Sequence, residues 1–315
     1  MEYLDTKQAI QYLLEEHGFK ISSSAFGRHC NEPLKLKSTK RSHKRIFTKE
    51  NLDTYYKYLN VNRINTRAEI IAFANHKGGV GKTLSVLNIA TAFTKFKKHK
   101  ILIIDFDPQA NLSSSYDINL EDIYTIDDVI MNDVDIKDAI IEIDPHTDFI
   151  PSYQDLCDFD LNLATNTNIN NLSDAIESII NNYDFIFIDC PPQISNLTYS
   201  AMVASDNLFI PMRPDMYSVD GLHTFMEYAK KFNENINIQG MFITQFSVSQ
   251  VLDLDYKERL EETYPKLLMK TVIRKNIALA ESVIYKKSIF DYKKNCSGYS
   301  DYKLLANEIY KRLGY

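Results

Sequence analysis

The sequence is poor in cysteine and contains no CxxC pair. Its four cysteines, Cys30, Cys157, Cys190 and Cys296, are far apart in a chain of 315 residues. A disulfide framework or a zinc site needs cysteines at close, paired spacings, so neither is indicated.

Long uncharged apolar runs are also absent. No stretch approaches the roughly 18 apolar residues of a membrane-spanning helix. The first residues, MEYLDTKQAI, are polar and amphipathic instead of a basic start followed by an apolar block. With 44% hydrophobic and 25% charged residues, the composition is typical of a soluble globular protein. We therefore expect a cytoplasmic protein without a signal peptide or a membrane span.

Charge is distributed unevenly along the chain. The first sixty residues contain eleven Lys and Arg against seven Asp and Glu, although the whole chain has a net charge of −6. Basic residues are densest between Arg28 and Lys49, where Glu32 is the lone acidic residue. Such a cluster favours binding to a polyanion, as in DNA-binding domains.

The order of short elements in this basic region predicts a small winged helix-turn-helix domain at residues 1–60. Helices are expected over Thr6–Glu16, Ser22–Cys30 and Lys49–Leu59. Between the last two, Leu34–Lys37 and Arg45–Thr48 predict a basic hairpin that would form the wing. The residues predicted to contact DNA are Ser23, Ser24, Arg28 and His29 on the second helix and Lys37, Lys40, Arg41, Lys44 and Arg45 on the wing.

The pattern changes after a linker predicted at residues 61–67. From residue 68 to 315, short apolar runs alternate with helical stretches, which predicts an α/β domain with a mainly parallel sheet covered on both faces. Strands are expected at Ile70–Ala74, Ile101–Asp105, Phe185–Asp189, Leu208–Pro211 and Ile238–Thr244, and a helix at Lys82–Lys97. Ligands of such sheets bind at the carboxyl ends of the strands.

A glycine-rich loop joins the first of these strands to the helix, in the segment IIAFANHKGGVGKT. The glycines allow several backbone N–H groups to converge on phosphate oxygens at the N-terminus of the helix. Lys82 is placed to reach the β and γ phosphates of ATP, and Thr83 is placed to coordinate Mg²⁺. The loop residues expected to bind the nucleotide are Gly78, Gly79, Val80, Gly81, Lys82, Thr83 and Leu84.

The loop departs from the strict GxxxxGK[ST] pattern, because His76 stands where that pattern requires glycine. Lys77, five residues before Lys82, gives the KGGxGKT form. This second lysine distinguishes the deviant Walker A class of P-loops.

Two apolar strands deliver acidic residues at their carboxyl ends, beside the expected P-loop. The segment ILIIDFDPQAN carries Asp105 and Asp107, and FIFIDCPP carries Asp189. Asp189 occupies the position of a Walker B carboxylate, which can hold a magnesium-bound water. The sequence therefore predicts a P-loop NTPase domain that binds ATP or ADP with Mg²⁺.

KGGVGKT, DFDPQAN, IDCPP and the late segment VIRKNIALAES together resemble the ParA branch of the ParA/MinD ATPases, over roughly residues 68–315. The resemblance implies that Lys77 is catalytic with Lys82 and reaches across a nucleotide-sandwich homodimer to the partner's ATP. It implies that Asp107 positions or activates the attacking water. It also implies that Asp105 supports the magnesium end of the site.

The same resemblance implies an ATP-dependent DNA partition protein associated with the nucleoid. Dimers would bind DNA without sequence preference through Arg274 and Lys275, although relatives often have Pro-Arg where this chain has Arg-Lys. Pro211 would flank the adenine, and a ParB-like centromere-binding partner would stimulate slow hydrolysis. Larger plasmid ParA proteins resemble this chain in having an added DNA-binding domain, which implies binding to an operator and autoregulation of the operon.

Three other functions share some of these motifs. A MinD-like membrane regulator would use a basic amphipathic terminal helix, but Ser300–Leu313 mixes charges of both signs and fits a last core helix better. An iron–sulfur ATPase needs paired ligand cysteines, and nothing marks Cys157 and Cys190 as that pair. A nucleotide-gated transcriptional repressor with little catalysis differs only in the rate of phosphate release.

Overall fold

The computed structural model describes residues 3–17, 39–41, 44–62, 67–153, 169–214 and 218–315. Its contacts group Met1–Arg67 as a small unit and nearly all of Ala68–Tyr315 as a large unit. Each unit contains a hydrophobic core of its own.

The small unit contains helices and a three-stranded antiparallel sheet. Its elements are β1 (Tyr3–Leu4), α1 (Thr6–His17), β2 (Thr39–Arg41), β3 (Lys44–Thr48) and α3 (Lys49–Asn62). The strand order is β1-β3-β2, so β3 pairs with both neighbours. The core is a cluster of buried side chains from α1, β3 and α3, namely Ala9, Leu13, Phe47, Leu52 and Tyr55.

The structure confirms the first and last helices predicted for this unit. The last helix continues to Asn62 and therefore occupies the first two residues of the predicted linker. A hairpin forms, but its first strand is Thr39–Arg41, because these residues lie next to Lys44–Thr48 across a short connection. The predicted strand Leu34–Lys37 and the predicted helix Ser22–Cys30 lie outside the described residues, so the winged helix-turn-helix stays a prediction.

The large unit is built on a seven-stranded sheet with the order β10-β9-β4-β8-β5-β7-β6. The strands are β4 (Glu69–Phe73), β5 (Ile101–Asp105), β6 (Ile141–Asp144), β7 (Thr147–Ile150), β8 (Phe185–Asp189), β9 (Asn207–Met212) and β10 (Asn237–Ile243). Neighbouring strands are parallel except β6 and β7, which form an antiparallel edge. The predicted mainly parallel sheet is confirmed, whereas the β6 and β7 strands were not predicted.

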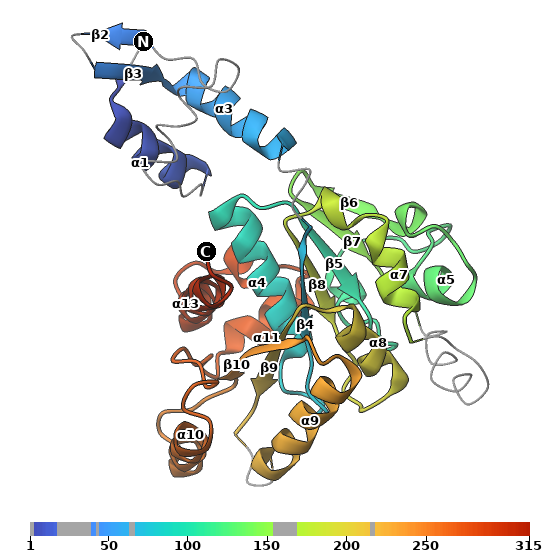
Figure 1. Ribbon diagram of the computed structural model, residues 1–315. Coiled ribbons are helices and arrows are strands. Elements are labelled where there is room, and N and C mark those ends of the chain that lie inside the picture. The colour runs from blue at the N-terminus through green and yellow to red at the C-terminus, as the bar shows by residue number, and fades with distance from the viewer. Residues whose placement is uncertain (1–2, 18–38, 42–43, 63–66, 154–168, 215–217) are drawn as a thin grey trace. The chain divides into compact units, whose positions relative to one another are not determined.

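Helices cover both faces of this sheet (Figure 1). They are α4 (Lys82–Lys97), α5 (Ile126–Met131), α7 (Asn171–Glu177), α8 (Asn196–Ala204), α9 (Ser218–Phe232), α10 (Val251–Thr263), α11 (Ile277–Ile284), α12 (Ile289–Tyr292) and α13 (Ser297–Arg312). Figure 1 shows α4 and α13 on one side of the sheet and α7 and α8 on the other. Every residue of β5, β8 and β9 is buried, which explains the apolar runs ILII, FIFI and LFIPM that they contain.

The strand order brings three carboxyl ends together in the middle of the sheet. The last residue of β8, Asp189, is the register partner of Phe73 on β4 and of Asp105 on β5. The loop that follows β4 therefore lies beside both predicted acidic segments.

The final helix, α13, belongs to the core of the large unit. Tyr302, Leu305 and Ile309 are buried, and the Tyr302 hydroxyl lies 3.3 Å from the Ser85 hydroxyl on α4. The interpretation of this segment as a core helix is confirmed. Within the described ranges, no helix has the length and apolar character needed to cross a bilayer.

Candidate nucleotide-binding site

The connection between β4 and α4 is a tight loop that requires glycine at two positions. Gly79 and Gly81 have φ values of 69° and 82°, in the left-handed region that is costly for residues with a Cβ atom. The Ser85 amide donates to the Gly81 carbonyl at 3.0 Å, so the first turn of α4 follows the loop directly. The helix N-terminus and the loop amides ahead of it can therefore face an anion together.

A cavity of about 520 Å³ opens beside this loop. One wall consists of the predicted nucleotide-binding residues Gly78, Gly79, Val80, Gly81, Lys82, Thr83 and Leu84. Asp107, Pro192 and Val283 line the cavity from other segments. The size and the glycine-loop wall match what a nucleotide phosphate group needs.

Pro211 does not line the cavity, although the resemblance implies that it flanks the adenine. It is buried near the end of β9, and its carbonyl accepts a hydrogen bond from the Asn75 side chain at 2.9 Å. Asn75 also accepts a bond from the Lys77 amide at 3.0 Å. Pro211 therefore supports the start of the loop, and a contact between its ring and a nucleotide stays a prediction.

Side chains after β10 hold the carbonyl groups of the loop. The Thr244 hydroxyl donates to the Val80 carbonyl at 2.8 Å, and the Gln245 amide donates to the Gly79 carbonyl at 2.8 Å. The sequence interpretation missed both residues, which are more than 160 positions from their partners. Their place at the carboxyl end of a parallel strand is the signal that could have found them.

Arg213 is a further residue that the sequence interpretation did not single out. Its guanidinium lies 3.8 Å from the position that a Cβ atom of Gly79 would occupy. The loop is therefore close to a third cationic side chain besides Lys77 and Lys82.

The ammonium group of Lys82 is buried within the loop. The side chain is 6% exposed, and Nζ donates to the carbonyls of Lys77 at 3.2 Å and Asn75 at 3.4 Å. Burial lowers the pKa of Lys82, whereas the nearby Asp189 carboxyl acts in the opposite direction. A poorly hydrated cation beside the cavity attracts phosphate more strongly than one in bulk water does.

Asp105 is fully buried and bonded to the protein. It accepts hydrogen bonds from the Ser113 amide at 2.8 Å, the Ser113 hydroxyl at 2.7 Å and the Asp107 amide at 3.2 Å. Burial raises its pKa to about 7, although these bonds favour the ionised form. Like Asp189, Asp105 is not among the residues that line the cavity. Because its oxygens already accept bonds from the protein, any support that Asp105 gives to a metal is indirect, through the segment from Asp107 to Ser113.

Asp107 borders the cavity directly. It is 5% exposed, and its Oδ1 atom accepts a hydrogen bond from the Gln109 amide at 3.0 Å. Burial raises the pKa of Asp107, and the Lys82 cation lowers it. A carboxylate held in this way is suited to orient a water molecule in the cavity.

The carboxyl group of Asp189 is fully buried and lacks hydrogen-bond donors in the described part of the chain. Neither of its oxygens has a partner at hydrogen-bonding geometry among the described residues. Burial raises the pKa of Asp189 well above its usual range, and Asp105 adds to this effect, whereas the Thr83 hydroxyl is close enough to oppose it. A buried carboxylate without partners is unfavourable unless a cation compensates it.

Asp189 and Thr83 fit the ligands that Mg²⁺ takes in P-loop proteins. Oxygen donors suit this ion, which usually keeps several waters and phosphate oxygens in place of a full protein cage. In the described part of the chain, no group of three or more His, Cys, Asp and Glu could hold a metal by itself. The site therefore fits a metal ion that arrives with the nucleotide.

Lys77 is half-buried at the start of the loop and, unlike Lys82, is not among the residues that line the cavity. Its predicted contact with the nucleotide of a partner subunit stays a prediction.

The residues predicted to contact DNA in the small unit are only partly covered by the structure. Ser23, Ser24, Arg28, His29 and Lys37 lie outside the described residues. Lys40 and Arg41 are on β2, and Lys44 and Arg45 are their register partners on β3. The predicted wing therefore corresponds to this hairpin, and its contact with DNA stays a prediction.

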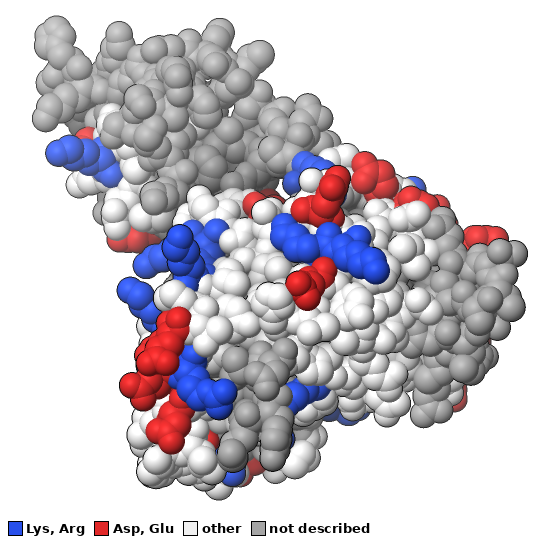
Figure 2. Space-filling model, turned by 60° about the horizontal axis from the view of Figure 1, so that its bottom comes forward, with Lys and Arg blue, Asp and Glu red and all other residues white. Residues whose placement is uncertain are grey.

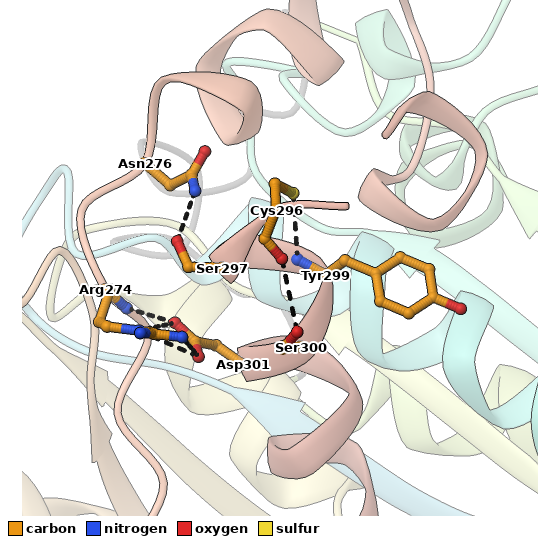
Figure 3. Close-up of polar contacts among 7 residues, drawn as sticks. All are labelled: Arg274, Asn276, Cys296, Ser297, Tyr299, Ser300 and Asp301. Atoms are coloured by element: carbon orange, nitrogen blue, oxygen red, sulfur yellow. Dashed lines mark hydrogen bonds and ion pairs between the residues drawn. The ribbon is translucent and has the colours of Figure 1, made fainter. Parts of the chain in front are cut away.

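Arg274, predicted to bind DNA, has a structural partner in the large unit. Its guanidinium binds both oxygens of Asp301 at 2.7 to 3.2 Å, and its amide donates to Asp301 at 3.0 Å (Figure 3). The Asp301 side chain is 6% exposed and the Arg274 side chain 46%. Arg274 therefore anchors its segment to α13, a role that the sequence prediction missed because Asp301 lies 27 residues away.

Lys275, the second predicted residue of this segment, is exposed. In the view of Figure 2, basic side chains of the large unit lie in small groups with acidic side chains next to them. Any DNA contact of the large unit on that face would therefore depend on local cations.

Comparisons with known proteins agree with this geometry. Residues 68–241 match the AAA domain family. The chain is 31% identical over 252 residues to the chromosome partitioning protein ParA of Caulobacter vibrioides, covering 77% of this chain and 94% of that protein. It is 32% identical over 248 residues to the sporulation initiation inhibitor protein Soj of Bacillus subtilis, covering 76% and 98%.

Solved structures share the fold of the large unit. A plasmid partition protein of Borrelia burgdorferi bound to AMPPNP superposes with a TM-score of 0.67 and 26% sequence identity. The match covers 78% of this chain and 100% of that one.

Proposed function

Because this chain belongs to the ParA family of partition ATPases, we propose that it uses ATP binding and hydrolysis to segregate DNA. It is a P-loop ATPase whose cofactors are ATP, ADP and Mg²⁺. The observation that carries the proposal is that Lys82 and Asp189 are both buried beside a glycine loop that lines a nucleotide-sized cavity.

The residues at the cavity have different roles in hydrolysis. The loop amides and Lys82 hold the phosphates, and Asp107 orients the attacking water. Mg²⁺ held by Thr83 and Asp189 would neutralise charge on the phosphate oxygens. Lys77 contributes from the second subunit, where its charge would stabilise the γ-phosphate in a site with little water.

ATP-dependent dimerisation has support in the apolar surface next to the cavity. Val283 lines the cavity and is 40% exposed, and on the same helix, α11, Ile277 and Ile284 are 79% and 78% exposed. Exposed apolar side chains that are grouped together mark interaction surfaces. A second copy that covered the nucleotide would bury them, so dimerisation would depend on ATP and end with hydrolysis.

The dimer is proposed to bind DNA without sequence preference through the segment that contains Lys275. A ParB-like centromere-binding partner is proposed to stimulate the slow hydrolysis. The small unit is proposed to bind an operator as a winged helix-turn-helix and to repress the operon that encodes the protein.

Light scattering coupled to size exclusion tests the central part of this function. The wild-type protein should be monomeric with ADP and dimeric with a non-hydrolysable ATP analogue. Lys77→Ala should remain a folded monomer in both states, whereas Lys270→Ala, an exposed lysine outside the cavity, should behave as wild type. Normal dimerisation of Lys77→Ala would refute the mechanism, and failure of all proteins to dimerise would refute the switch.

A full-length variant tests the small unit separately. Replacing Lys44 and Arg45 by Gln removes two positive charges from the hairpin and should weaken operator binding without changing ATP hydrolysis. Phosphate release measured with DNA and partner present separates a partition ATPase from a repressor with little catalysis. Operator affinity equal to wild type would contradict the assignment of the wing.

A further inference from the structure

Gln245 combines a strained backbone with a contact to the P-loop. Its φ is 52°, in the left-handed region, which costs roughly 1 kcal/mol for a residue other than glycine. Its side chain lines the nucleotide cavity and donates to the Gly79 carbonyl at 2.8 Å. Strained residues are retained where the surrounding structure requires their position.

The next residue connects Gln245 to the segment that contains Lys275. The amide of Phe246, which is buried, donates to the Ile273 carbonyl at 3.0 Å, and its carbonyl accepts from the Lys275 amide at 2.9 Å. Gln245, which bonds to the P-loop, is therefore the direct neighbour of Phe246, which bonds to Ile273 and Lys275 in the basic segment of residues 271–276.

The basic segment is held as a rigid piece. Arg274 is fixed to the buried carboxylate of Asp301 through both its amide and its guanidinium (Figure 3). The Ile273 amide donates to the Ile243 carbonyl at 2.8 Å. Because Arg274 is held by Asp301 and Ile273 by Ile243, a displacement at Gln245 would act mainly on the exposed Lys275, whose amide is bonded to the Phe246 carbonyl.

We propose that Gln245 is a positioning residue that couples the conformation of the P-loop to the DNA affinity of the segment around Lys275. This inference rests on the proposed function, because it presupposes that this segment contacts DNA. A nucleotide that shifts the Gly79 carbonyl would shift Gln245 and, through Phe246, the main chain of Lys275. Coupling of this kind is reciprocal, so DNA must change nucleotide affinity by the same factor.

Gln245→Gly should remove the proposed coupling without destabilising the protein. Glycine removes the amide donor but adopts a positive φ without strain, so this variant should be folded. Gln245→Asn keeps an amide and tolerates the left-handed region, and it should retain part of the coupling. Gln239→Ala is the matched control, because Gln239 lies on β10, the strand that precedes Gln245, and its side-chain amide donates to Asn207 at 2.7 Å instead of to the loop.

The first measurement is the affinity of the full-length protein for random-sequence duplex DNA, with a non-hydrolysable ATP analogue and with ADP. The ratio of these affinities should fall roughly threefold to tenfold in Gln245→Gly, as expected from the loss of one hydrogen bond in a coupled site. It should be unchanged in Gln239→Ala. A wild-type ratio in Gln245→Gly overturns the inference alone, whereas a ratio near one in the wild-type protein overturns the proposed DNA switch as well.

The second measurement needs no DNA. Hydrogen exchange of the Phe246 and Lys275 amides should change when the ATP analogue binds to the wild-type protein, and this change should be absent in Gln245→Gly. A wild-type protein whose P-loop amides respond to the nucleotide while the Phe246 and Lys275 amides do not would overturn the relay, whatever the DNA measurement shows.

Discussion

Asp105 and Asp189 are register partners at the ends of β5 and β8, and neither side chain is exposed. They differ in their partners. The oxygens of Asp105 accept bonds from Ser113 and Asp107, whereas those of Asp189 have no hydrogen-bond partner among the described residues. Asp105 therefore holds the adjacent loop together, and Asp189 is the carboxylate that is left for a cation.

This difference predicts opposite effects of two isosteric substitutions. Asp189→Asn replaces a buried carboxyl that has no hydrogen-bond partner within the described ranges and whose ionisation burial opposes, so the protein without nucleotide should unfold at the same or a higher temperature. Asp105→Asn replaces an acceptor of the Ser113 bonds and should lower the free energy of unfolding by about 1 to 3 kcal/mol.

Thermal unfolding with and without an ATP analogue and Mg²⁺ tests the metal ligand directly. In the wild-type protein, adding Mg²⁺ to the analogue should raise the unfolding temperature, because the metal binds the folded state alone. Asp189→Asn should lose this additional increase. An unchanged effect of Mg²⁺ in Asp189→Asn would remove Asp189 from the metal site.

The sequence predicts the centre of the large unit and its β10 edge well, and the β6-β7 edge poorly. The bounds of α4, β5 and β8 agree with the prediction to the residue, because buried strands and the P-loop helix have strong local patterns. β6 was missed because it is four residues long and half of them are acidic. Its position depends on pairing with β7, which no local pattern specifies.

The residues of the candidate site likewise differ in whether the sequence predicts them. Thr83, Asp107 and Asp189 stand in local motifs and were predicted from them. Gln245 and the partner of Arg274 were not, because both contacts join segments that are distant in sequence and are made only by the folded chain. Nothing in the residues around Arg274 indicates that its charge is already paired.

The free energy of unfolding should depend on pH because of Asp127, a residue that does not line the nucleotide cavity. It lies at the start of α5, is 4% exposed, and has one oxygen without a partner among the described residues. Burial raises its pKa from 3.8 to about 6. Because the folded protein holds this proton more tightly than the unfolded chain does, Asp127 contributes stability below about pH 4 that is lost as the pH rises through about 6.

Asp127→Asn should remove the loss of stability that occurs as the pH rises through about 6. The variant and the wild-type protein should be similarly stable near pH 4, and at pH 7.5 the variant should be more stable, by at most about 3 kcal/mol. Denaturant unfolding of both proteins across this range measures the difference directly. A difference that does not vary with pH would show that Asp127 does not titrate in the folded protein.

His76 and Gly221 predict a coupling between the P-loop and α9. A Cβ atom at Gly221 would lie 3.0 Å from Nε2 of His76, closer than side chains normally approach. Gly221→Ala should therefore displace the imidazole, which offsets the usual gain of about 1 kcal/mol for Ala over Gly inside a helix. In a His76→Ala background the contact is absent, so Gly221→Ala should then be stabilising.

A double-mutant cycle of unfolding free energies measures this coupling. The effect of Gly221→Ala should be more favourable by about 0.5 to 1 kcal/mol when residue 76 is Ala. Additive effects would mean that the ring of His76 moves away at no cost.

Arg274 and Lys275 are adjacent, and their substitutions should have different consequences. Arg274→Ala leaves the buried carboxylate of Asp301 without its cation. Removing one partner of a fully buried pair costs about 3 to 5 kcal/mol. Because the Arg274 side chain is 46% exposed, we expect a smaller loss, of about 1 to 3 kcal/mol. Lys275→Ala changes an exposed side chain and should alter stability by less than about 0.5 kcal/mol.

For DNA affinity, the substitution of Lys275 should have the larger effect. Lys275→Ala should weaken binding to random DNA and reduce the slope of log K against log salt by about one for each phosphate that the protein no longer neutralises. Arg274→Lys keeps the charge but not the paired geometry with Asp301, so it should restore little of the stability that Arg274→Ala removes. If Lys275→Ala bound DNA with wild-type affinity and salt dependence, this segment would not be the DNA contact of the large unit.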